Sequence, residues 1–242
     1  MKDGLTQIAV VLDRSGSMGG IQKATIESFN GYIDTQKASG DDVDVLFVQF
    51  DTENSYEVMH DGKISDCPVL TDDNYQPRGG TPLHDAIGQT ITSLGERLAA
   101  KPESERPSKV VVLILTDGYE NASHIYDTER VAALVKQQTE IYKWLFVFLG
   151  ANQDAILTAK SYAIHAGSSM TYNATSGGIR SAIGAASSIT DLWKFSSSSL
   201  DPCAVNFTVT QRLAAEEKVD PNATQPGNVS VNPNQDQQNS GQ

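Results

Sequence analysis

Short apolar segments alternate along the chain with segments in which apolar residues recur every three or four positions. The apolar segments are rich in Val, Ile, Leu and Phe and predict strands over residues 5–12, 43–50, 110–115 and 144–149. The helical spacing predicts helices over residues 21–37, 82–100, 128–142, 152–162 and 176–194. The two strands at 110–115 and 144–149 are almost wholly apolar, which is typical of strands covered on both faces.

Two weaker segments complete the predicted sheet. Residues 56–59 precede the turn dipeptide Asp61-Gly62, so we interpret them as a short hairpin strand at a sheet edge. Residues 169–172 predict a sixth strand, and residues 61–80 predict a loop. Strands that alternate with helices indicate the α/β class, with a mostly parallel sheet and helices on both faces.

The alternating pattern ends near residue 195. We therefore expect one domain over residues 1–195 and a polar C-terminal extension over residues 196–242, with a short polar helix at 211–219. From about residue 220 the chain is dominated by Asn, Gln, Pro and Gly. Such a composition buries too little apolar surface to offset the entropy of ordering, so this part is predicted to be largely disordered.

The chain is strongly acidic, with 18 Lys and Arg against 30 Asp and Glu and a formal net charge of −12. This charge argues against nucleic acid and anionic membranes as partners, because phosphate groups would repel it. No apolar stretch approaches the roughly 18 residues of a membrane span, and no targeting segment is apparent. Together with two well-separated cysteines, Cys67 and Cys203, which we expect to be free thiols, this predicts a cytoplasmic protein.

Oxygen-bearing side chains follow two of the predicted strands and precede one helix. Since ligands of open α/β sheets bind beyond the carboxyl ends of the strands, we expect these side chains to form one site. Carboxylates and hydroxyls are hard oxygen ligands, which suit Mg²⁺, with Mn²⁺ or Ca²⁺ as alternatives, rather than zinc or copper. The candidate metal ligands are Asp13, Ser15, Ser17, Thr81 and Asp117.

Neighbouring polar residues are expected to have other roles. Arg14 lies between two candidate ligands and should point away from them. We interpret Glu120 and Asn121 as solvated loop residues, and His84 as a residue at a helix start without a ligand role. Helix capping would explain Asp13 or Asp117 alone, but it does not explain the joint pattern.

Three motifs together resemble the metal-ion-dependent adhesion site of von Willebrand factor type A domains. They are Asp13-x-Ser15-x-Ser17, Gly79-Gly80-Thr81-Pro82-Leu83 and Leu115-Thr116-Asp117-Gly118, and the resemblance spans about residues 5–195. Each motif alone is weak, whereas all three in order, each beside a predicted strand or helix, are specific. The resemblance, to an intracellular bacterial or phage type, implies a doubly wound, six-stranded sheet in the order 3-2-1-4-5-6 with strand 3 antiparallel.

The resemblance also implies a role for each ligand. Ser15 and Ser17 would bind the metal directly, Thr81 and Asp117 would exchange between direct and water-mediated contact, and Asp13 would act mostly through its neighbours. Two carboxylates neutralise a divalent ion, and an open position on it can accept a further carboxylate. We therefore expect a non-catalytic module whose Mg²⁺ is completed by an Asp or Glu of a partner protein, such as an ATPase or an assembly protein.

An Mg²⁺-dependent, phosphoesterase-like hydrolase that uses the same site is the alternative. Against it, an aspartyl phosphotransferase needs a second carboxylate two residues after the first, and Ser15 occupies that position. The G-x-S-x-G elbow of hydrolases and the G-x-x-x-x-G-K-[ST] phosphate loop are both absent from the sequence. No general base is apparent near the predicted site.

Overall fold

Six strands form one sheet in the order β3-β2-β1-β4-β5-β6 in the computed structural model, which describes residues 1–40, 42–151 and 154–216. All neighbours pair in parallel except β2 and β3, which are antiparallel. The strands are β1 (Lys2–Asp13), β2 (Asp42–Phe50), β3 (Glu57–Lys63), β4 (Pro107–Thr116), β5 (Leu145–Ala151) and β6 (Ser169–Tyr172). The predicted fold class, strand order and antiparallel edge strand are confirmed.

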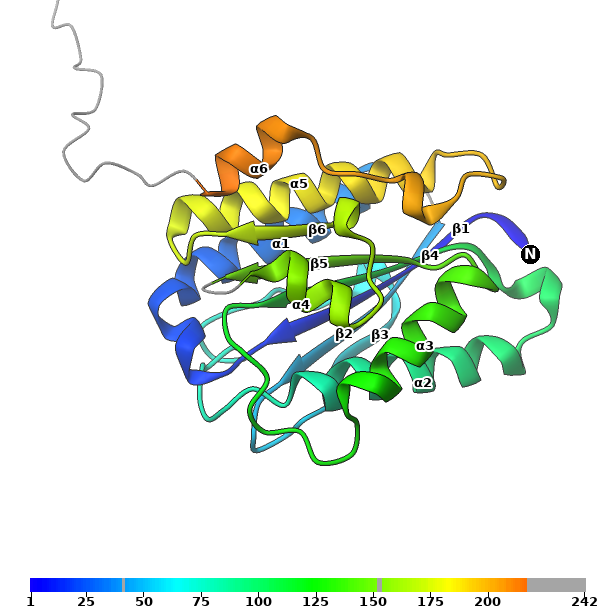
Figure 1. The fold of residues 1–242 in the computed structure, drawn as a ribbon. Helices are drawn as coiled ribbons and strands as arrows, with labels where there is room; N and C mark the ends of the chain where they lie inside the picture. Colours follow the sequence, from blue (N-terminus) through cyan, green and yellow to red (C-terminus); the bar gives the residue numbers. More distant parts are fainter. Residues whose placement is uncertain (41, 152–153, 217–242) are drawn as a thin grey trace, which may run out of the picture.

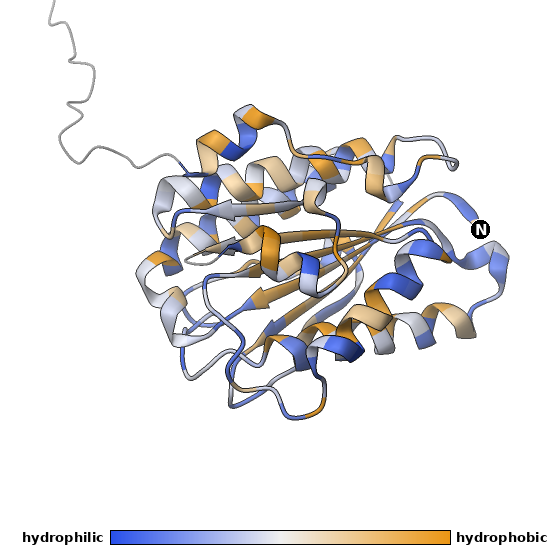
Figure 2. Cartoon of the chain, viewed as in Figure 1, coloured by the Kyte–Doolittle hydropathy of each residue, from blue (hydrophilic) through white to orange (hydrophobic). Residues whose placement is uncertain are grey.

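Helices cover both faces of this sheet (Figure 1). One face carries α1 (Gln22–Ala38) and α5 (Ser176–Lys194), and α6 (Val209–Glu216) packs on α5. The other face carries α2 (Leu83–Ala100), α3 (Thr128–Glu140) and α4 (Ala155–Ser161). In Figure 2 the central strands are predominantly hydrophobic, as expected for strands enclosed between two helical layers.

The alternation of side chains along the strands creates a separate apolar core on each face. In β1, Ile8, Val10 and Leu12 belong to the core beneath α1 and α5, whereas Ala9 and Val11 belong to the core beneath α2 and α3. All five are at most 2% exposed. Because each buried Val, Leu or Ile side chain contributes about 1.5–3 kcal/mol, β1 is held from both sides, and its carboxyl end is a fixed platform for the loop that follows.

The interpretation of Asp61-Gly62 as a turn was wrong, although an antiparallel edge strand is present. β3 continues through both residues, with Asp61 opposite Leu46 and Gly62 opposite Val45. The chain turns before β3 instead, where the Asp51 carboxylate accepts hydrogen bonds from the backbone N–H groups of the two residues Glu53 (2.7 Å) and Asn54 (3.0 Å). The chain therefore reverses at this Asp51-capped turn, and Asp61-Gly62 adopts the extended conformation of a strand.

The segment after residue 195 packs against the domain in the part that the structure describes. Val205, Phe207 and Ala215 are at most 5% exposed and belong to the core beneath α1 and α5. The backbone N–H of Phe207 donates to the Gly167 carbonyl (2.8 Å), and that of Asn173 donates to the Ala215 carbonyl (3.0 Å). The extension therefore runs beside the edge strand β6; the disorder predicted from about residue 220 concerns a part of the chain outside the described residues.

Two further predictions can be compared with the structure. Cys67 is buried, Cys203 is exposed, and both are free thiols, as predicted. Among the described residues, no helix combines the length and the apolar character needed to cross a membrane.

Candidate metal centre

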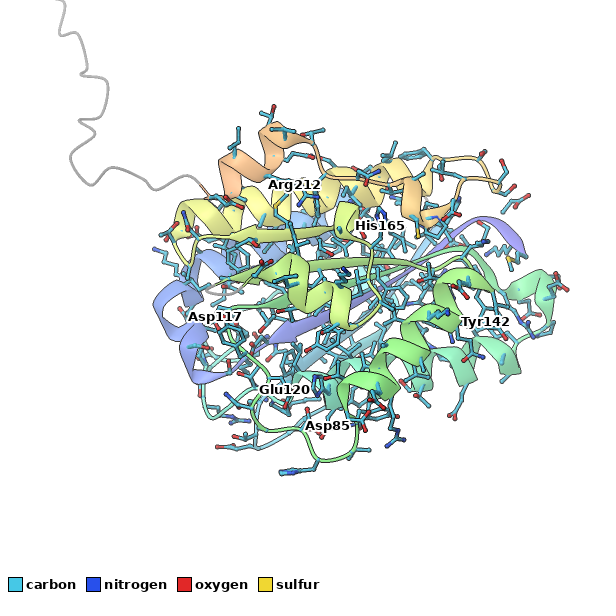
Figure 3. All side chains as sticks on the ribbon, in the orientation of Figure 1. Asp85, Asp117, Glu120, Tyr142, His165 and Arg212 are labelled. Carbon is cyan, nitrogen blue, oxygen red and sulfur yellow. The ribbon has the colours of Figure 1, made fainter. Side chains whose placement is uncertain are left out.

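The candidate ligands gather at one edge of the sheet because β1 and β4 are neighbours and end together. Leu12 lies opposite Leu115, so Asp13 and Thr116 follow at the same level, and Asp117 comes next. Figure 3 shows Asp117 at this carboxyl edge, beside the loop that enters α1. The topology thus brings the first and third motifs together, as expected from the sequence.

Asp13 is completely buried and holds the site together through hydrogen bonds. Its Oδ1 accepts from the backbone N–H of Ser15 (2.7 Å), and its Oδ2 accepts from the Thr116 hydroxyl (2.6 Å). Its backbone carbonyl accepts from the Tyr75 hydroxyl (2.7 Å). Both carboxylate oxygens are already engaged, which fits a residue that orients the loop rather than one that faces a ligand.

The two serines and Asp117 form a continuous row of oxygen atoms. Ser15 Oγ lies 3.1 Å from Ser17 Oγ, and the Ser17 hydroxyl donates to Asp117 Oδ1 at 2.5 Å. Ser15 and Asp117 are buried, whereas Ser17 is exposed at the surface. The row therefore meets solvent at its middle member, Ser17, between two buried oxygen-bearing side chains.

Thr81 reaches the same place through the loop that precedes α2. Arg78 N–H donates to the Arg14 carbonyl (2.9 Å) and Gly16 N–H donates to the Gly79 carbonyl (3.0 Å), so this loop is joined to the loop after β1. A Cβ added to Gly118 would lie 3.3 Å from Thr81 Oγ1 and 3.5 Å from Ser17 Oγ. The hydroxyls of Thr81 and Ser17 therefore both border the small space beside Gly118.

Glycine is required at position 79 for this loop to close. Gly79 has φ +63°, a conformation that side-chain-bearing residues rarely adopt, and an added Cβ would lie only 2.1 Å from Thr52 Oγ1. The neighbouring Gly80 N–H donates to the same hydroxyl (3.1 Å). The glycine pair is thus explained by the close approach of the loop to Thr52.

Burial makes both carboxylates costly to ionise. It raises the pKa of Asp13 to about 6, even though hydrogen bonds from Thr116 and Ser15 oppose the shift. It also raises the pKa of Asp117, with the Ser17 hydroxyl opposing. The side-chain partners of Asp13 are a hydroxyl and a backbone N–H rather than a basic group, so a bound cation would relieve this cost.

The donor set fits a hard divalent cation such as Mg²⁺. Two carboxylates and three hydroxyls converge, and these are the oxygen ligands that Mg²⁺, Mn²⁺ and Ca²⁺ take in proteins. Across residues 1–40, 42–151 and 154–216 there is no group of three or more His, Cys, Asp or Glu side chains that could hold a metal ion. A metal at this edge would therefore depend on the hydroxyls as well as on the carboxylates.

Arg14 points away from the candidate ligands, as predicted, and forms a buried ion pair. Its Nε donates to Asp51 Oδ2 (2.7 Å), and Arg78 Nε donates to the same oxygen (2.9 Å). Asp51 is completely buried, and Glu57 contacts Arg14 Nη2 at 2.5 Å. This network ties the loops after β1 and β2 to the loop that carries Thr81.

Glu120 is half-buried rather than solvated, whereas Asn121 is an exposed loop residue, as interpreted, and in addition bonds to Thr81. Asn121 Oδ1 accepts from the Thr81 backbone N–H (2.8 Å), and the Asn121 N–H donates to the Thr81 carbonyl (3.2 Å). Glu120 accepts hydrogen bonds from the backbone N–H groups of His84, Ala122 and Ser123 and from the Ser123 hydroxyl. Burial alone would raise the pKa of Glu120, but these hydrogen bonds outweigh it and lower the pKa.

The loop from Asp117 to the start of α3 is thus held at several points. Asp85, in the first turn of α2, accepts from the backbone N–H groups of three successive residues, 124–126. Figure 3 shows Asp117, Glu120 and Asp85 arranged along this loop. Glu120 precedes Ala122 and Ser123 by two and three residues, the spacing of a local side-chain cap, and this spacing was the sequence signal that could have identified it.

Comparison with known proteins supports the fold. No family model and no curated protein matches the sequence. Among solved structures, a von Willebrand factor type A protein from Catenulispora acidiphila is 14% identical with a TM-score of 0.51, covering 78% of this chain and 43% of its own. A minor pilin from Streptococcus sanguinis is 12% identical with a TM-score of 0.55, covering 81% of this chain and 64% of its own.

The von Willebrand factor domain of a type V pilus tip protein from Porphyromonas gingivalis is similar over nearly its whole length. It is 10% identical with a TM-score of 0.53, and the match covers 81% of this chain and 98% of that domain. At these identities the likeness concerns architecture alone. The chain has an α/β fold of the von Willebrand factor type A kind.

Proposed function

We propose that the chain is a divalent-cation-dependent protein-binding module whose ligands are Asp13, Ser15, Ser17, Thr81 and Asp117. The observation that carries this proposal is the contiguous row of Ser15, Ser17 and Asp117 oxygens, with the Thr81 hydroxyl bordering the same space. A bound Mg²⁺ supplies a positive charge with an open position that an Asp or Glu of a partner protein completes. Mn²⁺ or Ca²⁺ would serve in the same way.

In this proposal the chain's own residues divide the work. Ser17, exposed in the middle of the row, and Asp117 present oxygen atoms, while Asp13 holds the loop in place through its hydrogen bonds to Ser15 and Thr116. Asn121 fixes the backbone of Thr81 on the opposite side. Because these contacts hold the ligand-bearing loops in place, little reorganisation should be needed on binding, which favours affinity.

The structural neighbours and the cysteines guide the choice of partner. Two of the similar structures are a minor pilin and a domain of a pilus tip protein, so an assembly protein is a natural partner class, with an ATPase as the other. Two free thiols fit a reducing cytoplasm. The hydrolase alternative gains no support from the geometry, because no histidine bonds to the candidate nucleophiles among the described residues. The His84 ring nitrogen Nε2 is 3.1 Å from the Tyr162 hydroxyl, whereas the Ser15 and Ser17 hydroxyls contact each other and Ser17 contacts Asp117.

Titration calorimetry with Mg²⁺ and Mn²⁺ tests the metal site on the full chain. We expect saturable binding of one ion, and at least a tenfold loss of affinity in Asp117→Asn, which removes a negative charge, or in Ser17→Ala, which removes a ligand oxygen. Asp201→Asn is the matched control, since Asp201 caps a short helical turn at the C-terminal segment. Equal affinities in the wild-type protein and Asp117→Asn would refute the proposed site.

Water-proton relaxation of the Mn²⁺-loaded protein tests the open position. Exchangeable water on the ion enhances relaxation, and acetate, a minimal stand-in for a partner carboxylate, should reduce the enhancement in a saturable manner. Acetamide, which has the same shape without the charge, is the control. If neither molecule has an effect while Mn²⁺ still binds, the ion is structural and the partner-binding role is wrong.

A further inference from the structure

A cavity of about 320 Å³ opens between α2 and α3, at the end of the sheet opposite the candidate metal centre. Figure 3 shows Tyr142, one of its lining residues, on the far side of the molecule from Asp117. Val110 of β4 also lines the cavity, and the same strand reaches the metal centre at Thr116. At about 3.3 Å per residue, the two sites are about 20 Å apart.

Apolar side chains form much of the cavity wall, alongside polar side chains such as Gln138 and Ser108. Its walls include Ile91 and Leu98 of α2, Leu134 of α3 and Val110 of β4, together with Trp144, which directly precedes β5 and is 4% exposed. Small-molecule sites in proteins begin at about 300 Å³ and are mainly apolar with a few polar groups at fixed positions. The volume therefore suits a ligand with one aromatic ring rather than a large cofactor.

Gly95 keeps this cavity open at a cost to the helix. It lies within α2, where glycine is less stable than alanine by roughly 0.5–1 kcal/mol. An added Cβ would have Gln138 Nε2 as its nearest neighbour, at 3.6 Å, an ordinary van der Waals distance. An alanine at position 95 would therefore fit without a clash. Because Gly95 lines the cavity, the main consequence of the glycine is additional cavity volume where a methyl group would otherwise lie.

Arg106 places a positive charge at the edge of the same cavity. Its Nε donates to the Lys101 carbonyl and its Nη2 to the Ala99 carbonyl, each at 2.9 Å, which fixes the guanidinium against the end of α2. Within the described residues its Nη1 makes no hydrogen bond and no carboxylate pairs with it. Glu96 also lines the cavity, and it is exposed, so water screens its charge.

We propose that this cavity is a second ligand site, which binds a small molecule with one aromatic ring and a carboxylate. The ring lies among the apolar wall residues, in contact with Trp144, and the carboxylate accepts hydrogen bonds from Arg106. The site lies on the face covered by α2 and α3, in a different core from α5 and α6, and it needs none of the candidate metal ligands. It is therefore separate from the proposed protein-binding function.

Three probes that share a phenylpropyl skeleton and differ in charge test the ligand class. They are 3-phenylpropionate, 3-phenylpropionamide and 3-phenylpropylamine. Calorimetry on the full chain should show saturable binding with the anion tightest and the amine weakest. Arg106→Gln should bring the affinity for the anion down to that for the amide. Equal affinities for the three probes, or the tightest binding for the amine, would overturn the proposal.

Tryptophan fluorescence locates the bound probe, because the chain has two tryptophans in different cores, Trp144 and Trp193. In the variant Trp193→Phe the emission comes from Trp144 and should change on addition of phenylpropionate. In Trp144→Phe the remaining emission comes from Trp193 and should stay constant. A change confined to Trp193 would place the probe elsewhere and contradict the proposal.

Gly95→Ala separates binding from folding. It should raise the melting temperature by about 2–4 °C, through the better helix propensity of alanine, and weaken phenylpropionate binding at least fivefold. Gly31→Ala, on the exposed side of α1 where an added Cβ meets nothing within 4 Å, is the matched control and should leave affinity unchanged. Unchanged affinity in Gly95→Ala, or no binding of any probe to the wild-type protein, would refute the site.

Discussion

At the scale of single residues, the positions of the candidate ligands were predictable, but most of their supporting contacts were not. The motifs identified Asp13, Ser15, Ser17, Thr81 and Asp117 because each stands beside a strand end or a helix start. Tyr75, Thr116 and Asn121 bond to these residues across separations of 40 to 103 positions. Tyr75 and Asn121 had no local signal, because such contacts are created by the packing of distant segments.

Gly118→Ala tests whether the space beside Gly118 is needed for metal binding. The added methyl group would lie 3.3 Å from Thr81 Oγ1 and 3.5 Å from Ser17 Oγ, so it would fill the space that the two hydroxyls border. We expect Mg²⁺ affinity to fall about tenfold or more, with a loss of stability of about 1–3 kcal/mol. Gly20→Ala, whose Cβ would enter open space, is the control; calorimetry showing the same loss in both variants would contradict this reasoning.

Glu120 provides a prediction on pH. Hydrogen bonds lower its folded-state pKa below the ordinary value of about 4.3. A lowered pKa stabilises the fold above the unfolded-state value, and this stabilisation is lost as the pH falls through the folded-state value. The melting temperature of Glu120→Gln should therefore lie below that of the wild-type protein at pH 7, with the gap closing under acid conditions. The exposed Glu103→Gln is the control; a gap independent of pH would exclude the charge as its cause.

At the scale of elements, the sequence indicated the buried strands well and the edge poorly. β4 and β5 are buried on both faces, so their apolar runs were unambiguous. β3 lies at the edge and has no buried residue, so no apolar pattern marked its bounds in the sequence. Its start follows the turn capped by Asp51, and its pairing with β2 shifts register after Phe47. The C-terminal segment was equally hard to place, because a few isolated apolar residues, such as Phe207, carry its attachment.

Truncation after residue 195 tests that attachment. It removes Val205 and Phe207 from the core beneath α1 and α5, and it removes Ser196 and Ser197, which accept hydrogen bonds from the buried Lys109 ammonium. We expect the free energy of unfolding, measured with urea, to be about 3 kcal/mol lower than in the full chain, because two large apolar side chains are no longer buried. Truncation after residue 216 retains all of these contacts and should be neutral. Equal stability of the two truncated proteins would show that the segment rests on the domain without stabilising it.

At the scale of the whole molecule, the net charge of −12 and the acidic site pose one question: whether a divalent cation acts at one place or as a general counterion. A specific ion stabilises the folded state by RT ln(1 + [L]/Kd), which is about 2.7 kcal/mol at one hundred times Kd, whereas screening follows ionic strength alone. The melting temperature should therefore rise with Mg²⁺ well beyond its rise with Na⁺ at matched ionic strength. The excess should disappear in Asp117→Asn and persist in the surface variant Asp201→Asn, which has the same net charge. If Na⁺ and Mg²⁺ act alike in the wild-type protein, the acidic surface alone explains the response, and the cluster formed by Asp13, Asp117 and the three hydroxyls is a structural network of the loops rather than a metal centre.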